Sequence, residues 1–245
     1  MQSRDEYHHT AAIYDLFFSR SLRGIRYNIC TFITHCRARN VIDLCCGTGE
    51  QLQMLSKEDI VLTGVDLSPS MLTRAREKGS RKIIYLEADA SRLPLPDASY
   101  DGIIISLALH EKTALQHKAI FQEACRLLQP HGHIIIADYS HPTSGLSPLL
   151  LGKIVVPVIE RLAGINHYHN YRDWMRNGAV EGFLARENPG KSILISSHFQ
   201  GCIRLCAASQ VKESPLQASL KKIQANSPKT EQPSFIFPMK EQDSD

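Results

Sequence analysis

The sequence predicts an α/β fold with a mostly parallel sheet, and three observations support this prediction. Short apolar runs of strand length alternate with segments of helical periodicity from residue 41 to about residue 137. Acidic or other polar residues follow several of these runs. A turn with two glycines, Gly47 and Gly49, connects the first run to a helical pattern. Such alternation requires right-handed crossovers and places helices on both faces of the sheet.

The elements are expected in a regular order. Two helices, over residues 4–18 and 22–36, precede a first strand that starts at Val41. Ser68 and Pro69 resemble a capped helix start. Turns are expected at residues 93–98 and 130–132. The further strands are predicted over 60–65, 83–86, 102–107 and 133–137, and the further helices from Gln51 onward, over 70–78 and over 113–128.

The sequence changes character after the fifth strand. Residues 146–162 form an apolar, helical insertion, and a further helix opens at His167 and runs toward Leu184. Its polar aromatic residues and histidines resemble a substrate lid, with a solvated surface helix as the alternative. Strands are expected over 192–197 and 203–208, joined by a tight turn at 200–201. We therefore expect one domain over 1–210, with N-terminal helices in 1–38 and the lid in 139–188, and a disordered or loosely docked tail over 211–245.

The composition of the chain gives expectations about its partners and its cellular location. The chain of 245 residues has 28 Lys and Arg against 25 Asp and Glu, so no basic field indicates a nucleic-acid partner. The polar start, Met1 to His9, does not resemble a secretory signal, and the apolar stretch 149–159 is too short to span a bilayer. Seven cysteines without zinc-type spacing indicate reduced thiols. We expect a soluble, cytoplasmic protein without a structural metal; the sequence does not indicate an oligomeric state.

Polar residues are expected to converge at one edge of the sheet. The carboxyl ends of parallel strands meet at the same edge, and ligands of open α/β sheets bind there. The residues at or just beyond these strand ends are Asp43, Asp66, Asp89, Ser106, His110 and Asp138.

The acids distinguish between possible ligands. A dinucleotide loop requires a further glycine where this chain has Leu52, and Glu50 would repel a pyrophosphate at the helix start. Asp66, at the end of the second strand, can accept hydrogen bonds from both hydroxyls of a ribose. A cofactor with a ribose and a cationic, phosphate-free tail fits this pattern, and S-adenosylmethionine has both.

The ordered motifs resemble those of the class I S-adenosylmethionine-dependent methyltransferases, and within them the branch of the ubiquinone and menaquinone C-methyltransferases. The stretch Val41–Glu50 resembles the glycine-rich motif, residues 65–72 the ribose motif and residues 88–97 the adenine motif. Tyr100, Asp101, Ser106 and residues 127–132 resemble the markers of the fourth and fifth strands. The resemblance implies a Rossmann-like sheet of seven strands, one of them antiparallel.

The resemblance also implies roles for individual residues. Asp43, Gly47 and Gly49 would bind the methionine part, Asp66 the ribose, and Asp89 the adenine amino group. Cys46, in the glycine turn, is placed where it could touch the cofactor. The remaining expected contacts with S-adenosylmethionine, or with its product S-adenosylhomocysteine, come from Tyr14, Leu67, Met71, Ala90 and Ser106.

A methyltransferase mainly has to hold a nucleophile in line with the activated methyl group and exclude water. An oxygen or acidic carbon acceptor would benefit from a base, for which His110 is the first candidate and His141 and His169 are the next. The expected function is methyl transfer to a small-molecule or lipid-like acceptor. Methylation of protein or RNA, and a non-catalytic role as a binding or scaffold protein, are the alternatives.

Overall fold

The computed structural model describes residues 22–78, 80, 82–142, 152, 155–188 and 191–209. The expected helix over 4–18 with Tyr14, the tail over 211–245 and most of 143–154 lie outside the described residues.

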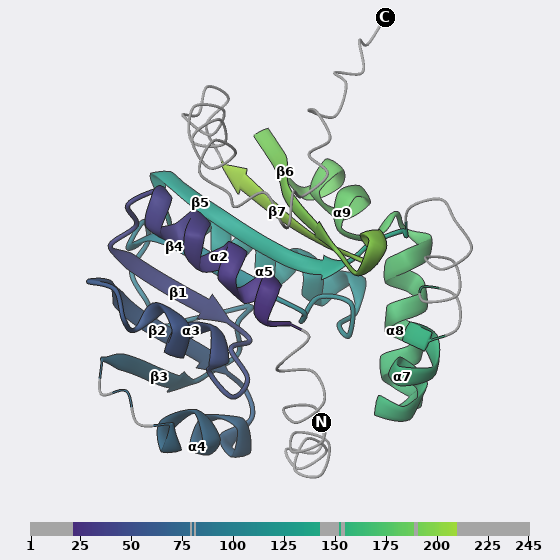
Figure 1. Ribbon diagram of the computed structural model, residues 1–245, viewed down its shortest axis with the longest axis horizontal. Helices are drawn as coiled ribbons and strands as arrows, with labels where there is room; N and C mark the ends of the chain where they lie inside the picture. Colours follow the sequence, from purple (N-terminus) through teal and green to yellow (C-terminus); the bar gives the residue numbers. More distant parts are fainter. Residues whose placement is uncertain are drawn as a thin grey trace, which may run out of the picture.

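The core of the fold is a sheet of seven strands in the order β3-β2-β1-β4-β5-β7-β6 (Figure 1). The first five strands pair in parallel, and β7 runs antiparallel to both β5 and β6. The predicted sheet with one antiparallel strand is therefore confirmed. The strands are β1 (Asn40–Leu44), β2 (Val61–Asp66), β3 (Ile83–Glu87), β4 (Tyr100–Ser106), β5 (Leu128–Tyr139), β6 (Lys191–His198) and β7 (Ile203–Ser209).

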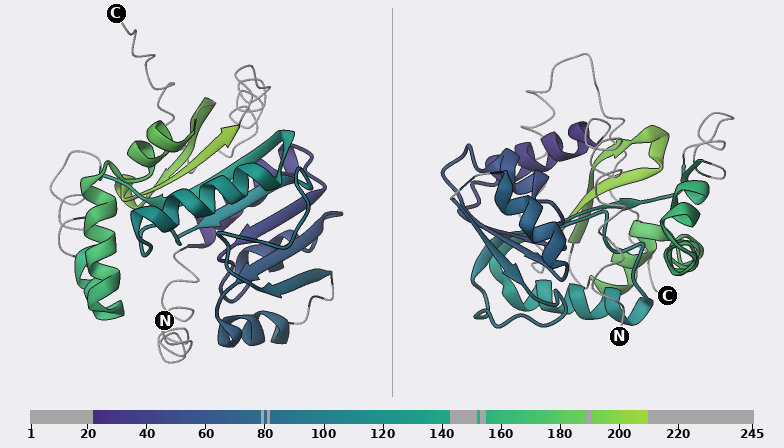
Figure 2. Two further views of the ribbon diagram at one scale, coloured as in Figure 1. Left: turned by 180° about the vertical axis from the view of Figure 1, so that it is seen from behind. Right: turned by 90° about the horizontal axis from the view of Figure 1, so that it is seen from below.

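Helices cover both faces of the sheet. Helix α2 lies on one face and α5 on the other, as the views from the front and from behind show (Figures 1 and 2). Thr113 caps α5 with a capping box, in which its side chain and that of Gln116 bond each other's backbone N–H groups. Ser68 caps α4, with Pro69 in its first turn. The helices before the insertion are α2 (Arg23–His35), α3 (Glu50–Leu55), α4 (Pro69–Glu77) and α5 (Ala114–Leu127).

The predicted turn at residues 130–132 is instead part of β5. Tyr100 pairs with Leu128 and Gly102 with His133, so five steps along β5 match two along β4. The extra residues form an irregularity that contains Pro130 and Gly132. The signals read as a turn therefore mark a bulge, and the strand starts earlier than predicted.

Among the described residues, three helices follow β5, where the sequence predicts an insertion. Helices α7 (Val156–Ala163), α8 (Ile165–Arg176) and α9 (Ala179–Glu187) lead from β5 toward β6. The prediction of one helix from His167 toward Leu184 is wrong, because Gly178 (φ 85°) and Ala179 (φ 55°) adopt left-handed backbone geometry and separate α8 from α9. Helices α7 and α8 lie beside the carboxyl end of β5 (Figure 1).

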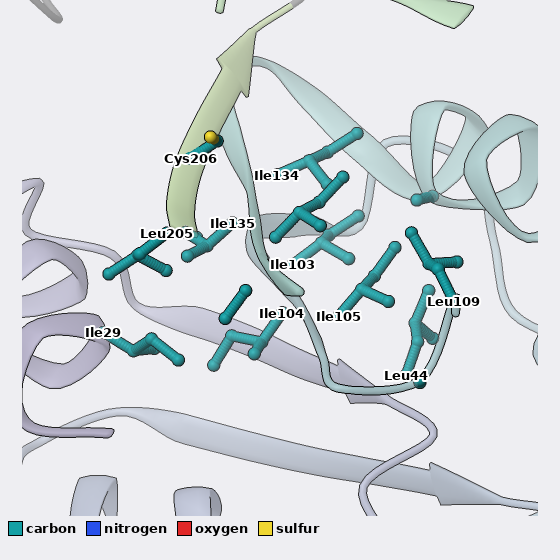
Figure 3. Close-up of a cluster of buried hydrophobic side chains, with 14 of the residues drawn as sticks. Ile29, Leu44, Ile103, Ile104, Ile105, Leu109, Ile134, Ile135, Leu205 and Cys206 are labelled. Carbon is teal, nitrogen blue, oxygen red and sulfur yellow. The ribbon is translucent and has the colours of Figure 1, made fainter. Parts of the chain in front are cut away.

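The central strands supply the hydrophobic core. Consecutive residues of β4 and β5, Ile103 to Ile105 and Ile134 to Ile136, are buried on both faces of the sheet (Figure 3). This explains why these strands appear as continuous apolar runs in the sequence. Burial of the centre leaves strand ends as the place where polar groups can meet.

Three further observations concern the described residues as a whole. Within them, no helix combines the length and apolar character needed to cross a membrane. The same residues contain no cluster of three or more His, Cys, Asp or Glu side chains suited to a metal ion. No disulfide joins the seven cysteines, which all lie among the described residues.

Candidate functional site

The glycine turn follows β1 directly and is tied to the end of β2. The N–H of Cys46 donates to the carbonyl of Val65 (2.9 Å), and the N–H of Gly49 donates to the carbonyl of Cys46 (3.0 Å). Cys45, Gly47 and Gly49 all have positive φ, at 64°, 53° and 72°. Since a non-glycine residue in this region is strained, Cys45 shows that the turn is held firmly by its neighbours.

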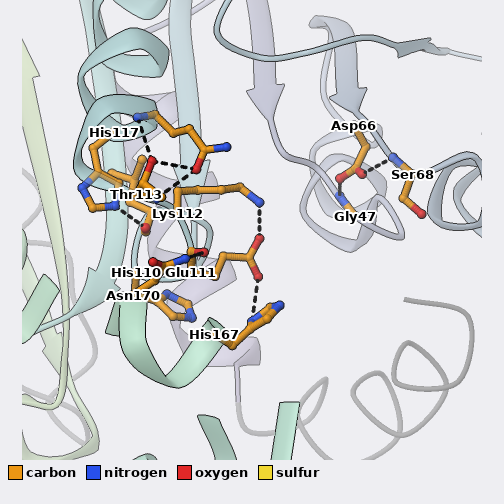
Figure 4. Close-up of polar contacts among 12 residues, drawn as sticks. Gly47, Asp66, Ser68, His110, Glu111, Lys112, Thr113, His117, His167 and Asn170 are labelled. Atoms are coloured by element: carbon orange, nitrogen blue, oxygen red, sulfur yellow. Dashed lines mark hydrogen bonds and ion pairs between the residues drawn. The ribbon is translucent and has the colours of Figure 1, made fainter. Parts of the chain in front are cut away.

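Asp66 connects two turns at the edge of the sheet (Figure 4). Its Oδ2 accepts from the N–H of Gly47 at 2.8 Å, and its Oδ1 accepts from the N–H of Ser68 at 2.9 Å. Burial raises the pKa of Asp66, although these two backbone donors act in the opposite direction. A carboxylate has about four lone-pair sites, so both oxygens can still accept from a ligand.

Asp43 lies near the end of β1, just before the turn, and is almost completely buried, at 2% exposure. Burial raises the pKa of Asp43 to about 8, with a further contribution from the nearby charge of Asp66 and an opposing one from Arg26. An acid with this pKa is mostly protonated at neutral pH. It would ionise readily beside a cation.

The surroundings of Gly47 and Gly49 differ. An added Cβ at Gly47 would meet no atom within 4 Å, so open space adjoins this backbone. An added Cβ at Gly49 would lie 2.4 Å from the hydroxyl oxygen of Tyr85. Gly49 is therefore required for packing as well as for its φ, whereas the backbone at Gly47 is open to a ligand.

Glu50 does not present an isolated negative charge. It forms an ion pair with Lys78, whose Nζ also donates to Thr48 Oγ1 at 3.0 Å. The sequence argument that Glu50 repels a phosphate is weaker for this reason, because Lys78 compensates its charge. The other argument against a dinucleotide is that position 52 is leucine and not glycine, and it does not depend on this ion pair. Leu52 is fully buried.

The remaining predicted cofactor residues lie at strand ends or in the turns that follow. Asp89 is exposed after β3, with Oδ1 accepting from the N–H of Ser91 at 2.8 Å, and Ala90 beside it is buried. Leu67 is 60% exposed, and Met71 is half-buried in the first turns of α4. Ser106 ends β4 and is half-buried. Their contacts with a cofactor stay predictions.

His110 is enclosed by carboxylates. Its Nδ1 lies 2.7 Å from Asp138 Oδ1, and its Nε2 lies 3.7 Å from Glu160 Oε2. Burial alone would lower the pKa of His110, but these carboxylates outweigh burial and raise it to about 9. The role of His110 as a base stays a prediction, and this geometry argues against it, because the ring is charged at neutral pH and both nitrogens already face acids.

The network around His110 joins the sheet to the helices of the insertion. The hydroxyl of Tyr139 donates to Glu160 Oε1 (3.0 Å), and Nε1 of Trp174 donates to the carbonyl of Tyr139 (3.0 Å). Glu160 belongs to α7 and Trp174 to α8. The end of β5 therefore anchors both helices.

His141 and His169, the other predicted bases, are exposed. The ring of His169 lies next to that of Tyr168, with 6.4 Å between centroids. The described contacts do not bring either histidine to the glycine turn.

A second polar group, formed by Glu111, Lys112 and His167, was not predicted from the sequence. Glu111 follows β4 and pairs with Lys112 (2.5 Å) and with Nδ1 of His167 from α8 (3.5 Å; Figure 4). Nδ2 of Asn170 donates to the carbonyl of Glu111 at 2.7 Å, which fixes α8 against this loop. The charges of Lys112 and Glu111 act in opposite directions on the pKa of Asp66, which they lower and raise respectively. No spacing in the sequence relates residue 111 to residue 167.

These features fit an adenosyl cofactor with a cationic centre. The open backbone at Gly47 provides contact area, and the Asp66 carboxylate beside it can accept hydrogen bonds from hydroxyl groups. The buried acid Asp43 provides negative charge when it ionises beside a cation.

Comparison with known proteins agrees with this geometry. A family model described as a methyltransferase domain matches residues 41–132. The demethylmenaquinone methyltransferase of Tropheryma whipplei (strain Twist) is 29% identical over 136 residues, which cover 54% of this chain and 56% of the relative. The 27-O-demethylrifamycin SV methyltransferase of Amycolatopsis mediterranei is 30% identical over 105 residues, or 40% of this chain and 38% of the relative. The chain spans about half the length of the curated relatives it matches.

Solved structures support the fold over most of the chain. An S-adenosyl-L-methionine-dependent methyltransferase described as putative, from Methanococcus maripaludis, has a TM-score of 0.58 at 17% identity and covers 87% of this chain and 97% of its own. The plantazolicin methyltransferase BpumL, solved in complex with S-adenosylhomocysteine, has a TM-score of 0.56 at 14% identity and covers 82% and 89%. At such identities the likeness concerns the arrangement of strands and helices.

Proposed function

We propose that this chain is a class I S-adenosylmethionine-dependent methyltransferase and that it transfers the methyl group of that cofactor to a small molecule with an apolar part. The single observation that carries this proposal is the Gly47–Asp66 pair. It combines an open backbone with a carboxylate held in place by two backbone donors.

Each residue of the turn has a physical task in this function. Gly47 lets the ligand lie against the main chain, and Asp66 accepts hydrogen bonds from the ribose hydroxyls. Asp43 supplies negative charge for the cationic part of the cofactor. The bound cofactor supplies an activated methyl group, and the protein has to orient the acceptor and exclude water.

The acceptor is proposed from two supporting observations. The relatives are named for demethylmenaquinone and for 27-O-demethylrifamycin SV, which are both small molecules. Helices α7 and α8 lie at the edge of the sheet that carries the glycine turn, where they would cover an acceptor as a lid. The free cysteines favour a reducing compartment, so we infer a cytoplasmic location.

Calorimetry with S-adenosylmethionine tests the cofactor site. We expect the wild-type protein to bind, and Asp66→Asn to weaken binding by about 10-fold to 100-fold, as is usual when a charged hydrogen-bond partner is lost. Asp59→Asn is the matched control, because the side chain of Asp59 is fully exposed beside Arg39. A folded wild-type protein that binds no S-adenosylmethionine would contradict the proposal and leave a scaffold role.

The acceptor requires a separate experiment. Labelled S-adenosylmethionine is incubated with the protein and with fractions of a cell extract separated into small molecules, proteins and RNA. We expect label in the small-molecule fraction. Label that appears only in the protein or RNA fraction would show a macromolecular acceptor.

A further inference from the structure

Helices α7 and α8 combine exposed aliphatic side chains with exposed cations. Val155, Val158 and Ile165 are 41%, 52% and 54% exposed. Val155 directly precedes α7, Val158 lies one turn further along the same side, and Ile165 is the first residue of α8. Arg161, one turn beyond Val158, is exposed as well. Both helices lie at one end of the molecule, beyond the carboxyl end of β5 (Figures 1 and 2).

The ring of Tyr168 connects the cations of the two helices. The guanidinium carbons of Arg161 and Arg172 lie 5.8 and 5.7 Å from the centre of this half-buried ring. Arg172 is exposed and lies on the same side of α8 as Ile165, seven positions earlier. Val155, Val158, Arg161, Ile165 and Arg172 therefore form one surface around Tyr168, which we call the outer face.

The inner sides of both helices are attached to the sheet, which fixes the direction of the outer face. Glu160 of α7 is buried and accepts from the hydroxyl of Tyr139 at 3.0 Å. Trp174 of α8 is buried and donates from Nε1 to the carbonyl of Tyr139 at 3.0 Å. The acid of α7 therefore points to the interior, and the exposed charge of this helix is that of Arg161.

The outer face has a net positive charge. Arg161 and Arg172 form no ion pair with an acid among the residues that the structure describes. The exposed acid of α8 is Asp173, which pairs with Arg176 at 3.8 Å. A partner of this face must therefore offer negative charge to the arginines and apolar surroundings to the aliphatic side chains.

We propose that the outer face docks on the surface of an anionic lipid bilayer. Such a surface meets both requirements, because its phosphate groups attract cations and its acyl region accepts aliphatic side chains. Arginine stems lie along apolar surroundings while their charged ends stay at the polar boundary, and tyrosine rings suit the same boundary. The cation pair around Tyr168 thus fits the level of the lipid head groups.

A second copy of this chain fits the outer face less well. In a twofold interface the same residues of both copies meet, so Arg161 and Arg172 would face like charges. Three half-exposed aliphatic side chains also supply far less than the about 800 Å² that each partner of a stable interface buries. Charge and area therefore both favour lipid over self-association.

The proposed methyltransferase function would give this contact a purpose, but the docking does not depend on it. The bond between Tyr139 and Glu160 ties α7 to the end of β5, and the bond between Asn170 and the carbonyl of Glu111 ties α8 to the loop after β4. A bilayer on the outer face would therefore lie next to the edge of the sheet where the acceptor is proposed to bind.

Flotation of the full-length protein with lipid vesicles tests the charges. Vesicles of phosphatidylcholine are compared with vesicles in which about a third of the lipid is phosphatidylglycerol. We expect binding to the anionic vesicles that weakens with added salt. Combined Arg161→Gln and Arg172→Gln should weaken it by about 30-fold, since each cation contributes about fivefold. The control combines Arg37→Gln and Arg39→Gln, two exposed positions before β1 at the opposite edge of the sheet.

A second pair of variants tests the aliphatic part. Ile165 and Ile84 are 54% and 57% exposed, and Ile84 lies on the edge strand β3 at the far end of the sheet from β5. Ile165→Asn should weaken binding to the anionic vesicles by about fivefold, because an exposed aliphatic side chain that enters the acyl region is lost. Ile84→Asn should stay within about twofold of the wild type.

A wild-type protein that floats with neither kind of vesicle would overturn the inference and leave the outer face to an acidic protein. Equal losses in the variants of the outer face and in their controls would also overturn it. So would a wild-type dimer that Ile165→Asn dissociates, because the face would then belong to a second copy.

Calorimetry with S-adenosylmethionine separates this inference from the proposed function. Both variants of the outer face should bind the cofactor within about twofold of the wild type. A wild-type protein that docks on anionic vesicles without binding S-adenosylmethionine would refute the methyltransferase and leave the docking intact.

Discussion

At the scale of single residues, the carboxyl of Asp43 connects the buried interior with the proposed cofactor. Its pKa of about 8 in the free protein results mainly from burial. The cationic centre of a bound ligand would favour the charged form and lower this pKa. Binding should therefore release a proton from Asp43 at neutral pH.

We predict that S-adenosylmethionine binds more tightly as the pH rises toward 8, by up to about tenfold per pH unit, and that the affinity levels off above this value. Calorimetry in buffers of different ionisation enthalpy should detect release of nearly one proton at pH 7. In Asp43→Asn the affinity should be lower and the proton release absent. Proton release that persists in this variant would assign the effect to another group.

Single residues also show how far the site could be predicted from sequence. Asp43, Gly47 and Asp66 were found because each lies at or just beyond the end of a strand, and their local spacing carries the signal. His110 was found for the same reason, but its partners Asp138 and Glu160 lie 28 and 50 positions away. Its charge state depends on those long-range contacts, so the sequence suggested a neutral base where the structure has a charged, enclosed ring.

At the scale of elements, the charged ring of His110 connects β5 to α7. Asp138 lies on β5 and Glu160 on α7, and the ring between them is almost completely buried. Two carboxylates without the positive ring would be costly at such burial. The attachment of α7 should therefore depend on the protonation of His110.

This dependence predicts a specific loss of stability at high pH. The pKa of His110 is raised from 6.5 to about 9, so its contribution is fully present below pH 6.5 and is lost as the pH rises through 9. The total is on the order of 3 kcal/mol, at 1.36 kcal/mol per pKa unit. Urea denaturation of the wild type and of His110→Gln between pH 6 and 10 measures it.

The difference in unfolding free energy between the two proteins should shrink with rising pH. Asp43 also has a raised pKa and destabilises the fold in the same direction, but it is present in both proteins and cancels in this comparison. A constant difference would show that His110 contributes by packing alone.

Elements were predicted well where local signals decide them. The alternation from β1 to α5 is confirmed, because each strand is a continuous apolar run and each helix has a polar face or cap. The failures are β5, where Pro130 and Gly132 mark a bulge, and the break between α8 and α9 at Gly178. Proline and glycine occur both in the turns between elements and at irregular positions within them, so these residue types alone do not show where an element ends. Long-range strand pairing or helix packing decides which of the two occurs.

At the scale of the whole molecule, the same central strands carry the core and hold the site. Ile104 of β4 is fully buried and lies in register with Asp43 of β1 and Ile135 of β5. Ile84 has the same side chain but lies on the edge strand β3 and is 57% exposed. The pair therefore separates the effect of burial from that of residue type.

We predict that Ile104→Ala lowers the free energy of unfolding by about 2–5 kcal/mol, because it removes buried contacts and leaves a cavity between packed strands. Ile84→Ala should cost less than about 1 kcal/mol, since its side chain is already largely in water. Denaturation followed by circular dichroism measures both. Because Asp43 pairs directly with Ile104, repacking should also displace the buried carboxyl, so Ile104→Ala should weaken S-adenosylmethionine binding under conditions where the variant is still folded. Equal stability losses in the two variants would show that β4 is not the packed centre of the sheet. Unchanged cofactor affinity in a destabilised Ile104→Ala variant would show that the glycine turn keeps its geometry independently of the core.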